Sequence, residues 1–165
     1  MTPAPAVSRI ERLTLLAEHV GNKRFRRLGT ALFRRAGGRL RPGGHDVLLL
    51  TTRGRRSGRG HTVLLQYFPD DDGMVVVAAN SGRTALPDWY LNLMAGPQAT
   101  VEIGGRSSRV HPVELTKDEA DAVWPRILRK APTYDRYLRA AGRAIPLVRL
   151  VTVQSPDPTG GGDGR

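Results

Sequence analysis

Apolar residues recur along the chain in short runs, separated by turns rich in glycine, proline or acidic residues. Runs of this length that carry β-branched residues predict strands. Six such segments are present: 48–52, 62–68, 74–79, 100–103, 107–115 and 145–153. Short strands with few helices, and without regular alternation of strand and helix, favour a closed or partly closed barrel over an open sheet. The sequence therefore predicts a mainly β fold of the α+β class, a barrel of antiparallel strands with flanking helices.

Helical periodicity marks the other segments. Ser8 and Glu11 form a capping-box pattern ahead of apolar residues at helical spacing, which predicts a first helix. Phe25, Leu28 and Leu32 line one face of a second, strongly basic segment. Further helices are predicted at 87–94, after a capping box at 116–119, and at 133–141. A proline at 125 should limit the helix after 116 or shift its start.

Length and composition divide the chain into three parts. At 165 residues it is long enough for one domain and too short for two of ordinary size. We expect a basic helical segment at 1–44, a barrel domain at 45–153 and a disordered tail at 154–165, where glycine, proline and aspartate dominate.

The formal charge of +11 is concentrated near the N-terminus, where residues 1–45 hold ten Lys or Arg and two acids. Such a segment can attract anionic lipid, nucleic acid or an anionic small molecule. A basic amphipathic helix can lie on a membrane, and a helix docked on the barrel explains the pattern equally well. Because no nucleic-acid motif is present, nucleic acid is not an expected partner. Without a long apolar run or signal core, we expect a cytoplasmic protein, with peripheral contact to the inner face of the membrane left open.

The stretch 48–65, LLLTTRGRRSGRGHTVLL, carries the strongest chemical signal. Its two apolar runs are joined by a connection with four arginines, at 53, 55, 56 and 59, set among glycines and Ser57. Glycines let a backbone approach a ligand closely, and guanidinium groups match phosphate or carboxylate oxygens. The pattern predicts an anion site, and the simpler alternative is a solvated basic turn.

Several other chemistries find no support in the sequence. The chain has no cysteine, and its four histidines lack metal-ligand spacing, so no metal site is expected. The acidic run 70–72 lacks the spacing of a calcium loop and predicts a solvated turn. Ser57 lacks the GxSxG context of a hydrolase, which favours a ligand contact over a nucleophile.

Four ordered motifs, TTRGRRSG, PDWYLNL, PTYDRY and IPLV, together resemble the deazaflavin-dependent nitroreductase family between about residues 47 and 150. The resemblance implies a split β-barrel that binds coenzyme F-420 and transfers hydride to nitro compounds, quinones or activated alkenes. No side-chain nucleophile is needed for this chemistry, because the coenzyme supplies the hydride.

The resemblance also implies roles for particular residues. Tyr134, with Tyr137 three residues later, would reach the substrate, where a phenol could donate a hydrogen bond as hydride adds. Residues on the basic connection, the strand after it, the end of the next strand and the PDWYLNL helix would contact the coenzyme: Arg55, Arg56, Ser57, Arg59, His61, Thr62, Val63, Leu64, Leu65, Ala78, Ala79, Asn80, Trp89, Tyr90 and Asn92. The simpler alternative for the tyrosines and for Trp89 is core packing.

Two departures from the family pattern remove cations. His61 stands where the family usually has arginine, and Asn80 where it often has lysine. Arg59 and Arg83 are near enough in sequence to replace them. The alternatives to a deazaflavin enzyme are a split-barrel oxidoreductase that uses flavin mononucleotide, or a non-catalytic protein that binds coenzyme or lipid.

Overall fold

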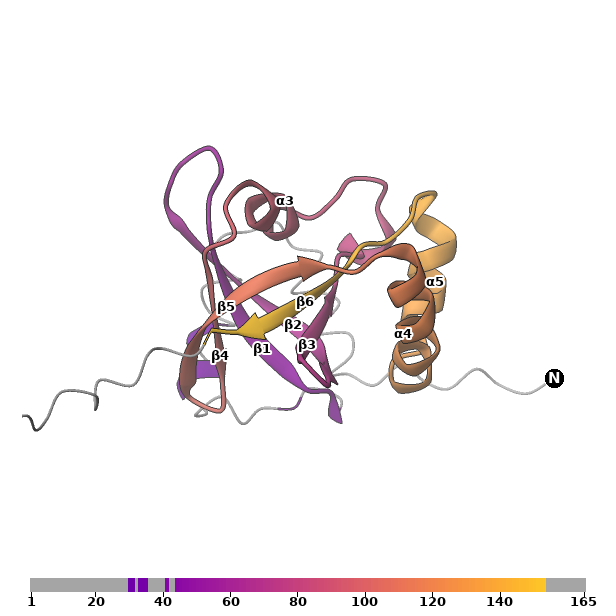
Figure 1. The fold of residues 1–165 in the computed structure, drawn as a ribbon, viewed down its shortest axis with the longest axis horizontal. Helices are drawn as coiled ribbons and strands as arrows, with labels where there is room; N and C mark the ends of the chain where they lie inside the picture. The colour runs from indigo at the N-terminus through magenta and orange to yellow at the C-terminus, as the bar shows by residue number, and fades with distance from the viewer. Residues whose placement is uncertain (1–29, 32, 36–40, 42–43, 154–165) are drawn as a thin grey trace, which may run out of the picture.

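The computed structural model describes residues 30–31, 33–35, 41 and 44–153. Six antiparallel strands close into a barrel in the order β1-β2-β3-β6-β5-β4 (Figure 1). The strands are β1 Val47–Arg53, β2 Gly60–Asp70, β3 Gly73–Val77, β4 Ala99–Ile103, β5 Arg106–Glu114 and β6 Leu147–Thr152. The predicted fold class is confirmed, and each predicted strand is present with ends shifted by two residues or fewer.

The helices are η2 Asn80–Gly82, α3 Asp88–Ala95, α4 Lys117–Lys130 and α5 Thr133–Ala141. The capping box is formed, since Thr116 and Glu119 bond each other's backbone N–H groups at the start of α4. The expectation for Pro125 was wrong, because α4 runs through it. Proline removes the hydrogen bond to the carbonyl of Asp121, and Asp121 is exposed, so water can take the place of the lost donor.

Tight left-handed turns set two strand ends. Gly104 and Gly105, with φ of 56° and 78°, form the predicted hairpin between β4 and β5. β3 stops at Val77, two residues before its predicted end, and Asn80, Ser81 and Gly82 all have positive φ. Left-handed backbone at non-glycine residues costs free energy and is often found where a segment serves a ligand site.

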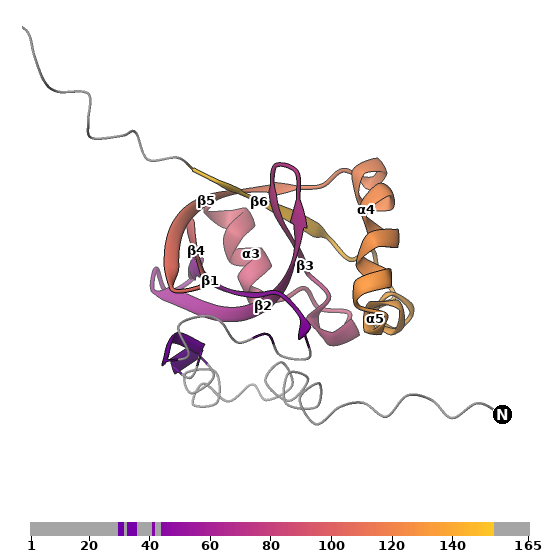
Figure 2. The same ribbon diagram turned by 90° about the horizontal axis from the view of Figure 1, so that it is seen from below.

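α3 closes one end of the barrel. Trp89, Tyr90 and Leu93 of α3 pack in the same cluster as the inward-facing residues of β1, β3, β4, β5 and β6. Figure 2 shows α3 within the ring of strands, while α4 and α5 lie outside it beside β3 and β6. The helix that the sequence placed after 87 is therefore part of the barrel core.

Two further clusters cover the outside of the barrel. One lies between β3 and β6 and the pair α4 and α5, and includes Phe68, Ile127 and Tyr137. The other contains Phe33, which is 2% exposed and packs with Val47 and Leu49. Arg34 beside it forms an ion pair with Glu102 of β4. The described part of segment 1–44 thus docks on the barrel; its two predicted helices otherwise lie outside the described residues, as does the tail 154–165.

The acidic turn after β2 corrects one prediction. Asp71 and Asp72 are exposed, as expected of a solvated turn, whereas the Asp70 side chain is 11% exposed. It accepts hydrogen bonds from Arg126 Nη2 at 2.8 Å and Arg149 Nε at 2.7 Å. Burial alone would raise the pKa of Asp70, but these two arginines outweigh burial and hold the pKa below its ordinary value.

Within the described part of the chain, no helix is long and apolar enough to cross a bilayer. The same residues contain no group of three or more His, Cys, Asp or Glu that could hold a metal ion.

Candidate active site

The arginine-bearing connection between β1 and β2 is a closed loop. Gly54 N donates to Arg59 O at 2.8 Å, and Gly58 N donates to Gly54 O at 2.8 Å. Gly58 has φ of +65°, a conformation that side chains rarely adopt. The glycines therefore fix the shape of the loop, and the arginines lie on its outside.

Ser57 and His61 meet over Gly54. Ser57 Oγ lies 3.2 Å from His61 Nε2 and accepts a hydrogen bond from Arg59 N at 3.3 Å. A Cβ at position 54 would lie 2.6 Å from His61 Nε2 and 2.7 Å from Ser57 Oγ, so a larger residue there would displace both side chains. The structure thus brings together two predicted coenzyme contacts, Ser57 on the loop and His61 at the start of β2.

Arg55 is tied to α3. Its backbone N and its Nη1 each donate to Asn92 Oδ1 at 3.1 Å, and Nη1 also lies 3.1 Å from Asp88 Oδ1. Asn92 is 4% exposed and its Nδ2 donates to Thr52 Oγ1 at 3.4 Å. Arg55 and Asn92, predicted to contact a coenzyme, therefore also fix the loop on the helix that closes the barrel.

Arg56 and Arg59 have a different environment. Both are exposed, and their guanidinium groups form no hydrogen bond or ion pair with any residue in the described ranges. No Asp or Glu occurs between Arg53 and Gly60. These two cations are available to an anionic ligand.

β2 presents an open backbone edge beside the loop. Its residues from Gly60 to Gln66 pair with β1 on one side. On the other side β3 pairs only from Tyr67 onward, so this half of β2 has no second strand partner within the described chain. Val63 and Leu65 pack with the interior cluster, Leu64 packs near Phe33, and Thr62 Oγ1 lies 2.9 Å from Thr51 Oγ1. The predicted contacts at 62–65 therefore leave mainly backbone at the edge.

Arg143, which the sequence analysis did not single out, holds the segment that follows β3. Its guanidinium donates to five carbonyl oxygens: those of Thr84 at 2.8 Å, Ala144 at 3.0 Å, Ala78 at 3.2 Å, and Arg83 and Ala85 at 3.3 Å. Burial lowers the pKa of Arg143, and the nearby Tyr90 acts in the opposite direction. An isolated arginine before a strand gives no sequence pattern that would reveal such a cluster.

The predicted contacts at 78–80 lie on this same segment. Ala78 and Ala79 are buried, and Asn80 is half-buried with φ of 48°. Asn80 Nδ2 donates to Ala85 O at 2.8 Å, so its amide helps to fold the segment. The segment also lies against α5, because a Cβ on Gly82 would be 3.2 Å from Tyr137 Cα.

Trp89 and Tyr90 lie in the barrel core at 7% and 8% exposure, with ring centroids 6.2 Å apart in an edge arrangement. Tyr90 Oη donates to Glu114 Oε2 at 2.8 Å. Burial, then the hydrogen bond and charge of Glu114, raise the pKa of Tyr90 to about 12. Their packing is that of core residues, and their contact with a coenzyme stays a prediction.

Tyr134 and Tyr137 belong to an aromatic cluster between α5 and the barrel. The ring centroid of Tyr134 lies 6.0 Å from Phe68, 6.5 Å from Trp124 and 5.6 Å from Tyr137. Tyr137 is 7% exposed, whereas Tyr134 is half-buried. The structure thus places Tyr137 beside the segment after β3 and Tyr134 next to it in the aromatic cluster, and their catalytic role stays a prediction.

The structure thus combines an antiparallel barrel, an open strand edge on β2 and an arginine loop beside that edge. A solved F420-H2 dependent reductase shares the fold with a TM-score of 0.58 and 27% identity, over 64% of this chain and 93% of its own. The model of the F420H(2)-dependent quinone reductase family matches residues 20–152, and the chain belongs to this family.

Related sequences agree with this assignment. The F420H(2)-dependent quinone reductase Rv1261c of Mycobacterium tuberculosis is 32% identical over 141 residues, which cover 82% of this chain and 94% of the relative. The putative F420H(2)-dependent quinone reductase Rv3178 of the same organism is 33% identical over 104 residues, which cover 63% of this chain and 87% of the relative. A solved structure described as a domain-swapped dimer is 26% identical with a TM-score of 0.59, covering 75% of this chain and 95% of its own.

The protein is therefore an oxidoreductase that uses coenzyme F-420, in place of the alternatives of flavin mononucleotide or a non-catalytic role. The residues present fit an anionic coenzyme. Glycine at position 54 leaves Ser57 and His61 in contact above the backbone, two arginines on the loop have no described partner, and the loop contains no acid. With these features, backbone N–H groups and guanidinium groups can donate hydrogen bonds to a phosphate or carboxylate group.

Proposed function

We propose that this protein transfers hydride from reduced coenzyme F-420 to a quinone, a nitro compound or an activated alkene. The observation that carries the proposal is the open edge of β2 next to the loop of Arg56 and Arg59, in a chain of the quinone reductase family. When bound, the coenzyme supplies the hydride, and the protein supplies position and electrostatics.

The residues of the chain have distinct tasks in this proposal. Arg56, Arg59 and the Ser57 hydroxyl bind the anionic groups of the coenzyme. Arg55 and Asn92 hold the loop in place from α3. The Tyr134 hydroxyl donates a hydrogen bond to the substrate oxygen on which negative charge develops.

A titration of the full-length protein with coenzyme F-420, followed by absorbance, tests the binding step. The double variant Arg56→Ala/Arg59→Ala should bind at least about a hundredfold more weakly, since a charge-assisted hydrogen bond contributes roughly 1.5–3 kcal/mol and 1.4 kcal/mol is tenfold. Arg129→Ala/Lys130→Ala removes the same charge from the exposed end of α4 and should bind like the parent protein. Equal affinity in all three proteins would show that the loop is only a basic turn.

A turnover assay with one quinone, one nitroaromatic compound and one α,β-unsaturated ketone tests the substrate class. If none of the three compounds oxidises the reduced coenzyme, the proposal is contradicted.

The basic N-terminal segment supports a second proposal, peripheral contact with anionic membrane, because its ten cations over residues 1–45 would be attracted to anionic lipid. Co-sedimentation with anionic vesicles at low salt should decrease when residues 1–29 are deleted, a deletion that keeps Phe33 and Arg34 in place on the barrel. Equal sedimentation of both proteins would refute membrane contact without bearing on catalysis.

A further inference from the structure

A groove on the β1, β4 and β5 side of the barrel is lined by none of the residues that the sequence predicted for the coenzyme and the substrate, although it adjoins two of them, since Thr51 contacts Thr62 and Thr52 contacts Asn92. It has a volume of 620 Å³ and is lined by the end of β1, the beginning of β4 and the middle of β5. No helix in the described part of the chain covers it, because α4 and α5 pack on β3 and β6 and Phe33 packs on Val47 and Leu49.

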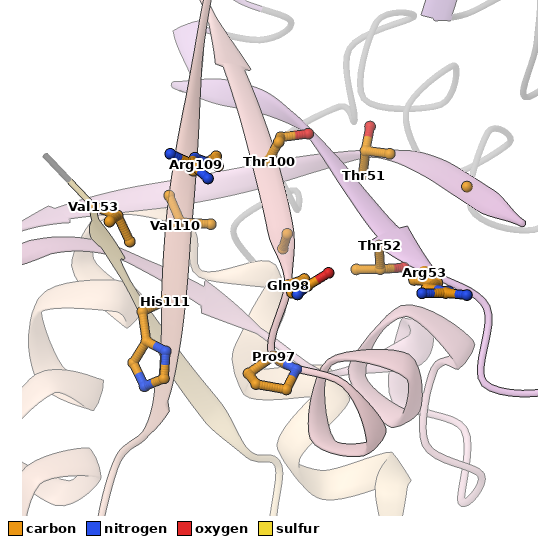
Figure 3. Close-up of a pocket in the computed structure, with 12 residues that line it drawn as sticks. Thr51, Thr52, Arg53, Pro97, Gln98, Thr100, Arg109, Val110, His111 and Val153 are labelled. Carbon is orange, nitrogen blue, oxygen red and sulfur yellow. The ribbon is translucent and has the colours of Figure 1, made fainter. Parts of the chain in front are cut away.

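The strand register arranges polar side chains in two rows across the groove. Thr51, Thr100 and Arg109 are neighbours on β1, β4 and β5. The next residue along each strand, Thr52, Ala99 or Val110, is buried and faces the barrel interior. The second row is Arg53, Gln98 and His111. Figure 3 shows Thr51, Thr100 and Arg109 following one another across the three strands.

The groove is basic and carries no opposing charge. No Asp or Glu lines it. The guanidinium groups of Arg53 and Arg109 form no ion pair or side-chain hydrogen bond with the described residues, and the nearest acid along β4, Glu102, is already paired with Arg34. β1 and β5 are two strand spacings apart, about 10 Å, so two flexible arginines can reach one group between them. Thr100 is the cross-strand neighbour of Arg109 and lines the same groove, so its hydroxyl can add a hydrogen bond.

We propose that this groove, which adjoins the coenzyme loop, binds a small ligand of its own with phosphate or carboxylate groups. Arg53 borders both the groove and the loop, because a Cβ on Gly58 would lie 3.7 Å from Arg53 Nη2, whereas Arg55 is held on α3 by Asn92. Asn92 touches both, since its Oδ1 accepts from Arg55 and its Nδ2 donates to Thr52, a groove residue.

Titration of the full-length protein with inorganic phosphate, at constant ionic strength against chloride, tests the proposal by NMR. The backbone amides of Thr100 and His111 should shift and saturate. Arg109→Gln should weaken the binding at least tenfold. Arg106→Gln is the matched control, because Arg106 is an exposed arginine on the same strand that does not line the groove, and it should leave the affinity unchanged. Absence of saturable shifts, or equal losses in both variants, would overturn the site.

A parallel titration with coenzyme F-420 distinguishes two sources of the oxyanion group. For a separate ligand, Arg109→Gln should leave the affinity for the coenzyme unchanged. If it weakens both phosphate and coenzyme binding, the groove holds an acidic group of the coenzyme itself, and the claim of a separate site fails. Failure of the proposed function gives a different result from failure of the groove proposal. In that case coenzyme F-420 does not bind the parent protein, while the amide shifts caused by phosphate persist.

Discussion

Replacing Arg143 by alanine should both destabilise the protein and weaken coenzyme binding. The guanidinium group bonds five carbonyls between Ala78 and Ala144 and is the main polar support of the segment 78–85. Three residues of that segment, Asn80, Ser81 and Gly82, have positive φ. The segment therefore depends on contacts with the rest of the protein to keep its shape.

The loss in the free energy of unfolding depends on which of the five carbonyls water can reach in the Arg143→Ala variant. Only the bond to Ala78 O is partly buried, and the other four are exposed. A buried acceptor left without a donor costs about 1–3 kcal/mol, whereas water can replace most of an exposed bond. With a small contribution from the four exposed bonds, we expect the free energy of unfolding to fall by about 2–4 kcal/mol.

Urea unfolding followed by fluorescence measures this loss, because Trp89 lies in the barrel and Trp124 in α4. Arg139→Ala is the matched control on the neighbouring helix α5. Among the described residues, the exposed Arg139 pairs with Asp135, four residues earlier, and its loss should cost about 0.3–0.5 kcal/mol. Arg143→Lys keeps the charge but not the planar fork, and should recover only part of the stability.

A second measurement separates support of the site from support of the fold. At a temperature where both proteins are folded, Arg143→Ala should bind coenzyme F-420 more weakly than the parent protein, because Ala78, Ala79 and Asn80 lie on the affected segment. The reasoning fails if Arg143→Ala loses no more stability than Arg139→Ala.

Three further predictions follow from the same structure. Gly82→Ala should lower the free energy of unfolding in urea clearly more than Gly104→Ala. Both glycines have positive φ, but only at position 82 does the new Cβ lie 3.2 Å from Tyr137 Cα. Equal losses would contradict the close packing of α5 on this segment. Asp70 has a lowered pKa in the folded state, so its contribution is present above an unfolded pKa of about 3.9 and is lost as pH falls through the folded value; Asp70→Asn should flatten the acid limb of stability against pH, and an unchanged limb would refute it. Tyr134→Phe should slow single-turnover hydride transfer about tenfold or more with little change in melting temperature, whereas a lower melting temperature at unchanged rate would assign Tyr134 to the core alone.

The sequence predicts the barrel well because each strand carries its own local signal. Apolar runs, the Gly104 and Gly105 hairpin and the capping box at Thr116 depend only on neighbouring residues, and the structure confirms them. Pro125 was predicted wrongly because the carbonyl that it leaves without a donor, that of Asp121, is exposed to water. Asp70 was predicted wrongly for a tertiary reason, since its partners Arg126 and Arg149 come from α4 and β6, which no local pattern reports.

The candidate site shows the same division. The loop of four arginines is evident from the sequence, but the pairing of Ser57 with His61 over Gly54 depends on the register between β1 and β2. Arg143 and the groove of Arg53 and Arg109 were not found, because their members come from segments far apart in the chain. Only the three-dimensional structure brings such residues together.

The contacts of Arg55 change how the motif TTRGRRSG should be understood. Four adjacent cations repel one another, which opposes the compact shape that the backbone hydrogen bonds give the loop. Asp88 and the buried Asn92 remove Arg55 from this set and anchor the loop on α3, while Arg56 and Arg59 stay exposed. The motif is therefore a set of residues with two tasks. Replacing Arg55 should disturb coenzyme binding through the position of the loop, whereas replacing Arg56 should remove a direct contact and leave the loop in place.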